Sequence, residues 1–103
     1  LTDIISKAWS GNTTKEYKQL KNLKKENLRD NMTNLELVLN MLAEATTSEI
    51  SKEKKPDGFN ESKKVAKEGG IIAGDTRKAI EEKTGNKIVT KQNAQNLLED
   101  KKT

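Results

Sequence analysis

Cysteine and histidine are both absent from this chain of 103 residues, and their absence removes most routes to catalysis. Without thiolates or imidazoles, a zinc site would have to be built from carboxylates alone. The chain also lacks a thiol nucleophile and an imidazole general base. We therefore expect a protein that is not an enzyme and that uses neither a metal nor a cofactor.

Aromatic and apolar side chains are scarce as well: 3% of the residues are aromatic and 31% hydrophobic, against 35% charged. No apolar run approaches the roughly 18 residues of a membrane span, so we expect no membrane partner. The lack of cysteine fits a reducing compartment and favours a cytoplasmic protein. A chain of this length and composition predicts one domain, residues 1 to 103, that completes a small core by self-association. Because the chain begins with Leu1 rather than Met, we expect a piece of a longer protein.

The positive charge is modest and dispersed. Eighteen lysines and two arginines face sixteen acids, which gives a net charge of +4. Proteins that bind nucleic acids usually gather such charge on one face and use arginine for bidentate contacts. A solvated, solubilising shell is therefore favoured over a nucleic-acid surface, which stays open as an alternative.

Two shorter helices are expected in the first third of the chain. Apolar residues at helical spacing, closed by Gly11, predict one helix within residues 1 to 12, with Trp9 as a core or interface anchor. A second helix is predicted within residues 13 to 33, capped by Thr13 with Glu16 or by Thr14. Its apolar side is supplied by Tyr17, Leu20, Leu23 and Leu28. Its lysines recur every third residue and drift around the helix, which indicates a solvated face: Lys15, Lys18, Lys21 and Lys24.

The strongest helix signal lies at residues 33 to 50. Thr33 and Glu36 have the spacing of a capping box, and Met32 with Leu37 has the spacing of a hydrophobic staple. Apolar residues cover about 240° of this helix, which is more than one neighbouring helix can bury. The surplus predicts a contact with another subunit. The candidates from this helix are Leu35, Leu39, Met41 and Leu42.

Pro56 and Gly58 end that helix, and a second long helix is predicted from residue 58 to residue 84. It contains Gly69, Gly70 and Gly74, but these glycines do not have the spacing of a phosphate-binding loop, and no predicted strand precedes them. Ala66, Gly70 and Gly74 instead leave one helix face almost without side chains, which predicts close packing against the helix at 33 to 50 or its symmetry mate. Gly70 and Gly74 are therefore interface candidates.

The predicted fold is all-α. Its two main helices span about residues 33 to 53 and 58 to 84, with shorter helices on either side. Residues 86 to 90 are predicted to form a short extended link. Thr90 can then cap a last helix that carries Ala94, Leu97 and Leu98.

Several segments together resemble the C-terminal region of the DNA-damage-inducible protein D-like and prophage antirepressor-like proteins of bacteria. The resemblance covers about residues 1 to 98, and its most specific pieces are "NLRDNMTNLEL" and "GGIIAGDTRKAIEEKTG". In that family an N-terminal Bro-N type domain is associated with DNA binding, so the resemblance implies that this N-terminal domain is absent here. It further implies a cytoplasmic, non-enzymatic protein of phage regulation or the DNA-damage (SOS) response.

Two functions follow as expectations. The first is a C-terminal accessory domain that forms a homodimer and presents a surface to a partner. The partner is another protein, or it is DNA that the full-length protein contacts. The second is direct DNA binding through a lysine-rich helical face made of Lys63, Lys64, Lys67, Arg77 and Lys78. Arg77 beside Asp75, and Arg29 beside Asp30, could instead serve local ion pairing or capping.

Overall fold

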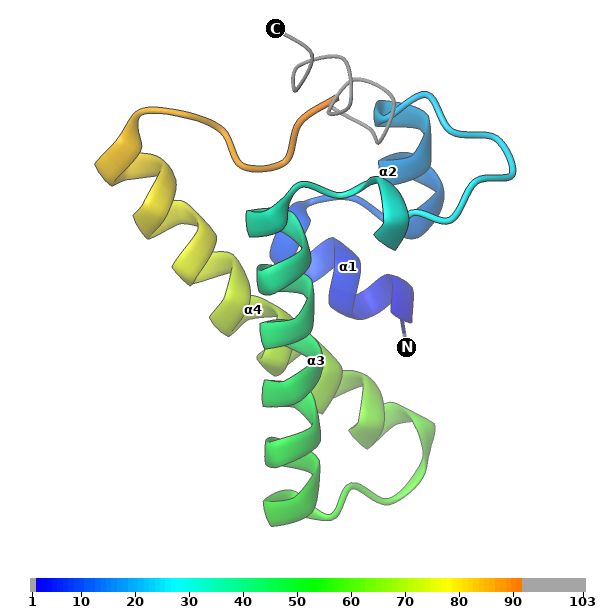
Figure 1. Cartoon of the computed structure of the whole chain (residues 1–103). Helices are drawn as coiled ribbons and strands as arrows, with labels where there is room; N and C mark the ends of the chain where they lie inside the picture. Colours follow the sequence, from blue (N-terminus) through cyan, green and yellow to red (C-terminus); the bar gives the residue numbers. More distant parts are fainter. Residues whose placement is uncertain (1, 92–103) are drawn as a thin grey trace, which may run out of the picture.

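The computed structural model describes residues 2 to 91 as an arrangement of four α-helices. The helices are α1 (Thr2–Ser10), α2 (Thr14–Leu20), α3 (Asn34–Lys54) and α4 (Gly58–Thr84), with one 3-10 turn, η1 (Arg29–Asn31). The all-α prediction is confirmed, and so are the two long helices, whose ends lie within a residue or so of those expected. In Figure 1, α3 and α4 cross, α1 lies beside the N-terminal half of α3, and α2 follows beyond α1, past the start of α3. No helix among residues 2 to 91 has the length and apolarity needed to cross a bilayer.

Local signals set both ends of α3. Thr33 Oγ1 accepts the backbone N–H of Glu36, and Glu36 Oε1 accepts the N–H of Thr33 at 3.0 Å, so the predicted capping box forms. The helix ends where Lys55 adopts a left-handed conformation (φ 46°), just before Pro56. At the far end of α4, Gly85 takes φ 75°, which residues with a β-carbon rarely adopt.

The prediction of one helix through residues 13 to 33 is wrong beyond Leu20. Asn22 has φ 60°, its N–H donates to Gln19 O, and the N–H of Leu23 donates to Lys18 O at 2.8 Å. These two hydrogen bonds make a Schellman motif, in which asparagine is the usual substitute for glycine. Leu23, Leu28 and Met32 still enter the core, but they do so from irregular chain.

The glycines of α4 do allow close packing, but the partner of the predicted ladder differs from the one expected. Gly70 and Gly74 face α1: a β-carbon on Gly70 would lie 2.9 Å from Ile5 O, and one on Gly74 would lie 3.0 Å from Ala8 O. Gly69, which the ladder left out, faces α3, where a β-carbon would lie 2.8 Å from Thr47 N. Because consecutive helical residues point about 100° apart, Gly69 and Gly70 let α4 approach two helices at once.

The core lies between α1, α3 and α4, and α2 contributes Tyr17 to it. Trp9 and Tyr17 are fully buried with ring centroids 6.0 Å apart, and Trp9 Nε1 donates a 3.2 Å hydrogen bond to Asn40 Oδ1. The prediction that Trp9 anchors the core is therefore confirmed. Ile88 also packs against this cluster, so the segment after α4 returns to the core.

Replacing Gly70 with leucine is expected to destabilise the fold by about 1–3 kcal/mol or more, although leucine is the better helix former. The added side chain would have to enter the space of Ala8 and Ile5 O. Ala79→Leu, at an exposed position of the same helix, is the matched control and should leave stability nearly unchanged. Thermal or urea unfolding measures both. A Gly70→Leu variant as stable as the parent would show that α1 does not pack on this glycine.

Candidate functional site

Three polar side chains meet in the interior at the start of α3. Lys21 Nζ lies 2.7 Å from Glu36 Oε1, both side chains are fully buried, and the Tyr17 hydroxyl donates to Glu36 Oε2. Lys21 Nζ also donates to the carbonyl of Thr90 at 2.9 Å and lies 5.6 Å from the centre of the Tyr17 ring. This cluster corrects the prediction that Lys21 lies on a solvated lysine face.

The fold of α2 explains why Lys21 turns inward while its neighbours do not. Lys21 is the last residue before the chain reverses at Asn22, so it lies where α2 meets the N-terminus of α3. There the carboxylate of Glu36 is already held by the capping box. No local pattern marks Lys21, because its partners are 15 and 69 residues away along the chain.

The buried cluster has the chemistry of a structural ion pair. Burial and the hydrogen bond to Glu36 raise the pKa of Tyr17, so its hydroxyl remains protonated. The Glu36 carboxylate receives bonds from the ammonium group, the phenol and a backbone N–H. Since no part of Lys21 or Glu36 is exposed, a substrate has no access to either charge.

Arg77, one of the five predicted nucleic-acid contacts, is engaged inside the chain. Its Nε donates to the Trp9 carbonyl at 2.7 Å, and its guanidinium pairs with Glu81 at 2.8 Å. Glu81 in turn accepts the N–H of Ile88 at 3.0 Å. Arg77 therefore connects the end of α1 to α4 and to the segment after it.

The local ion pairs suggested for the two arginines have different partners from those predicted. Arg77 pairs with Glu81 rather than Asp75, and Arg29 pairs with Glu44 of α3 at 3.2 Å rather than with Asp30. The other nucleic-acid candidates are exposed on α4 and make no ion pair among residues 2 to 91: Lys63, Lys64, Lys67 and Lys78.

The interface candidates divide between the interior and the surface. Leu39 is 2% exposed and belongs to the core, and α1 covers Gly70 and Gly74. By contrast, Leu35 and Met41 are 46% and 50% exposed, and Leu42 is half-buried. Val38 belongs to the apolar surplus of this helix but was not among the predicted interface candidates, and it is the most exposed of the large apolar residues on α3, at 57%.

These side chains form one surface, which we call the outer α3 face: Leu35, Val38, Met41, Leu42 and Ala45. At about 100° per residue, Val38, Met41 and Ala45 point away from the side of α3 that carries Glu36, Leu39 and Ala43. Leu42 and Leu35 lie at the edge of this face: Leu42 also packs against the core, and Leu35 lines a hollow with Ile80 and Ile88. The nearest charge on this half of the helix, Glu44, turns to the flank and pairs with Arg29. The outer α3 face is therefore apolar and uncharged over three helical turns.

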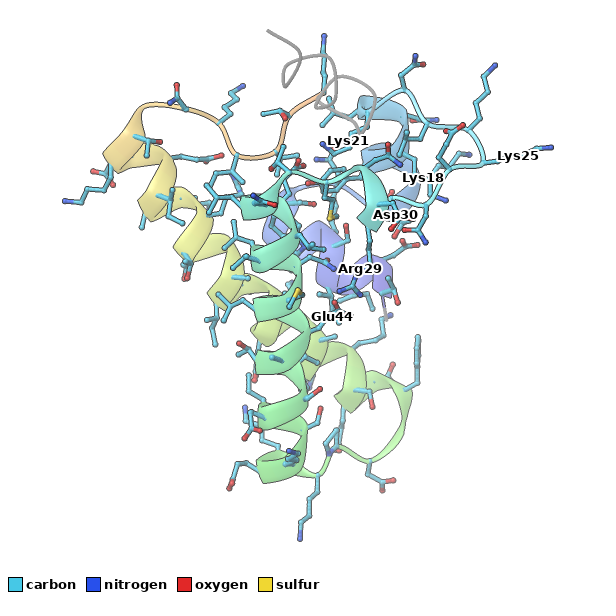
Figure 2. The ribbon with its side chains drawn as sticks, in the orientation of Figure 1. Lys18, Lys21, Lys25, Arg29, Asp30 and Glu44 are labelled. Atoms are coloured by element: carbon cyan, nitrogen blue, oxygen red, sulfur yellow. The ribbon has the colours of Figure 1, made fainter. Side chains whose placement is uncertain are left out.

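A second surface surrounds α2, where two hollows adjoin. One, of about 480 Å³, is lined by Lys15, Lys18 and Lys24 together with Asp3, Thr14 and Leu23. The other, of about 270 Å³, shares Thr14 and Lys18 and reaches Arg29, Glu44 and the apolar residues Ile5, Leu28 and Met32. Figure 2 shows Lys18, Arg29 and Glu44 in the region where α2, the following loop and α3 meet, with Lys25 pointing outward from the loop. The proximity of these cations was not predicted from the sequence, in which their spacing indicated that they drift around a helix.

No group of three or more acidic side chains within residues 2 to 91 is placed to hold a metal ion. The predicted last helix, with Ala94, Leu97 and Leu98, lies outside the described residues. No family model, curated protein or solved structure matches this chain. The resemblance to the damage-inducible and antirepressor-like proteins therefore stays a prediction.

Glu36→Gln is expected to cost about 3–5 kcal/mol of stability, because it removes the carboxylate that lies 2.7 Å from the buried Lys21 ammonium group. Adding Lys21→Met should recover part of this loss, since the buried ammonium group is then removed as well. Glu49→Gln, which removes an exposed pair with Lys52, is the control and should change stability by less than about 1 kcal/mol. Urea unfolding gives all three values. Equal effects of Glu36→Gln and Glu49→Gln would contradict the buried pair.

The single tyrosine offers an optical test of the same cluster. Because the pKa of Tyr17 is raised above its ordinary value of 10.0, the folded state keeps its proton where the unfolded state loses it. Tyr17 therefore contributes stability that is complete below pH 10 and is lost progressively above it. In an alkaline titration, tyrosinate absorbance should appear together with the loss of helical circular dichroism. Ionisation of Tyr17 near pH 10 in a chain that is still helical would contradict this environment.

Proposed function

We propose that this chain is a non-enzymatic accessory domain that joins two copies of a longer protein through the outer α3 face. The observation that carries the proposal is the exposure of Leu35, Val38 and Met41 on successive turns of a helix whose opposite side is already buried. Exposed apolar patches of this kind are typical of interaction surfaces.

A second copy of the chain is the occupant that best fits this face. A partner chosen by charge would need complementary charges, and the outer α3 face has none between Leu35 and Ala45. A two-fold axis across α3 would set Val38 and Met41 against the same residues of the other copy. Apolar side chains of one copy would then be buried against apolar side chains of the other. Ile72 of α4, 45% exposed, offers further apolar surface.

Leu39, Gly70 and Gly74 have no part in this proposed contact, because they are buried within one chain. Of the predicted interface residues, the proposal keeps Leu35, Met41 and Leu42 and adds Val38. Leu39→Glu would test the folding of the chain rather than its association.

The family resemblance supplies the proposed setting, which is a cytoplasmic regulator of the DNA-damage response or of phage genes. In such a protein, pairing two C-terminal domains would bring two DNA-associated N-terminal domains together. Two linked binding modules bind with much higher effective affinity than either alone. The support for this setting is the set of segments named above, chiefly the start of α3 and the middle of α4.

Sedimentation equilibrium at micromolar concentration should give the mass of a dimer for the parent chain. Val38→Glu combined with Met41→Glu should raise the dissociation constant by about a hundredfold or more, since each buried carboxylate costs more than about 1.4 kcal/mol. Phe59→Glu with Ile71→Glu is the matched control, because both residues are exposed but lie on α4. A monomeric parent, or equal dissociation of the two double variants, would sink the proposal.

A further inference from the structure

The cations around α2 are brought together by the way that the helix ends. In a continuous helix, Lys15, Lys18 and Lys24 would point in directions that drift by about 60° for every three residues. The Schellman motif at Asn22 instead turns the chain, so that Lys24 lines the same hollow as Lys15 and Lys18. Three lysines thereby line one concave surface.

Three acids lie near this hollow, and each accepts a hydrogen bond or pairs with a cation elsewhere in the chain. Asp3 accepts the N–H of Thr14 at 3.1 Å, and hydrogen bonding to Thr14 lowers the pKa of its carboxyl group. Glu26 accepts the N–H of Lys24 at 2.8 Å, and Glu44 pairs with Arg29.

The lysines lack comparable partners. Within residues 2 to 91, the ammonium groups of Lys15, Lys18 and Lys24 take part in no ion pair. Three lysines against the one carboxylate of Asp3 leave this hollow with a net positive charge, which attracts an anion.

The adjoining hollow has a different character. Its apolar residues are Ile5, Leu28 and Met32, and it shares Lys18 with the lysine-lined hollow. At about 270 Å³ it lies near the lower end of the range for small-molecule sites, roughly 300 Å³. A ligand that fits both hollows must therefore join an anionic group to a compact, largely apolar one.

We propose that these two hollows bind single-stranded nucleic acid, with phosphates at Lys15, Lys18 and Lys24 and a base over Ile5, Leu28 and Met32. A nucleotide carries both groups in one unit, whereas an acidic peptide side chain carries only the charge. Lysine ammonium groups suit phosphates as point charges, without the planar geometry that arginine requires. A single strand is required because a base in a duplex is stacked and cannot leave the helix without loss of pairing. This inference is independent of self-association through the outer α3 face.

Fluorescence anisotropy with a labelled thymidine oligonucleotide tests the site in the parent chain and in two triple variants. The first, Lys15→Ala with Lys18→Ala and Lys24→Ala, should raise the dissociation constant at least about tenfold. The slope of the logarithm of the binding constant against the logarithm of the salt concentration should also become less steep by about two. This is the change expected when three phosphate contacts to a single strand are lost. The matched control, Lys63→Ala with Lys64→Ala and Lys67→Ala, removes the same charge from α4 and should change affinity by less than about threefold. Circular dichroism melts should show that both variants remain folded.

Five other results would contradict the proposed nucleic-acid site. Equal weakening in both triple variants would mean unspecific attraction to positive charge, and weakening in the α4 variant alone would place the contact on Lys63, Lys64 and Lys67. Competition by poly-glutamate as strong as that by the oligonucleotide would indicate an acidic polypeptide. Tighter binding of a duplex of the same length would exclude the base in the apolar hollow, and no binding at low salt would exclude the site altogether.

Discussion

The carboxylate of Glu36 is the group on which the arrangement of this chain depends. It receives hydrogen bonds from the backbone of Thr33, the ammonium group of Lys21 and the hydroxyl of Tyr17. A buried charge is tolerated only when it is paired and its remaining oxygen sites are satisfied, and here each contact comes from a different part of the chain. The start of α3, the end of α2 and, through Lys21, the carbonyl of Thr90 are held together in this way. In Figure 1 the segment after α4 accordingly runs back across the N-terminal end of α3.

The two adjacent glycines of α4 decide which surfaces remain available. Gly69 admits α3 and Gly70 admits α1, so α4 lies against both helices with little side-chain bulk between them. Because α1 and α4 occupy one side of α3, the other side has no cover from its own chain within residues 2 to 91. The outer α3 face is thus a consequence of how the helices pack, and the proposed self-association would supply the missing cover.

The fold also separates side chains that are alike in the sequence. Lys21 is buried in an ion pair, while Lys18, one turn earlier, lines the rim of two hollows. Arg77 bonds to the Trp9 carbonyl, whereas its helical neighbour Lys78 is exposed. Three lysines that are dispersed along the chain therefore line one hollow beside α2. The dispersal of lysines in the sequence was a poor guide to their arrangement on the surface.

The sequence by itself determined the helices and most of their ends, because the signals for these lie within a few residues of one another. Thr33 with Glu36, Pro56 with Gly58, and Gly85 all act over one helical turn. Asn22 gave a similar local signal for the end of α2, but the apolar spacing through Leu23 and Leu28 masked it. Only the tertiary structure decided that Gly70 meets α1, that Lys21 meets Glu36 and Thr90, and that Val38 stays exposed while Leu39 is buried. Those outcomes depend on contacts between residues far apart in the chain, and no local spacing records which helix will occupy a given face.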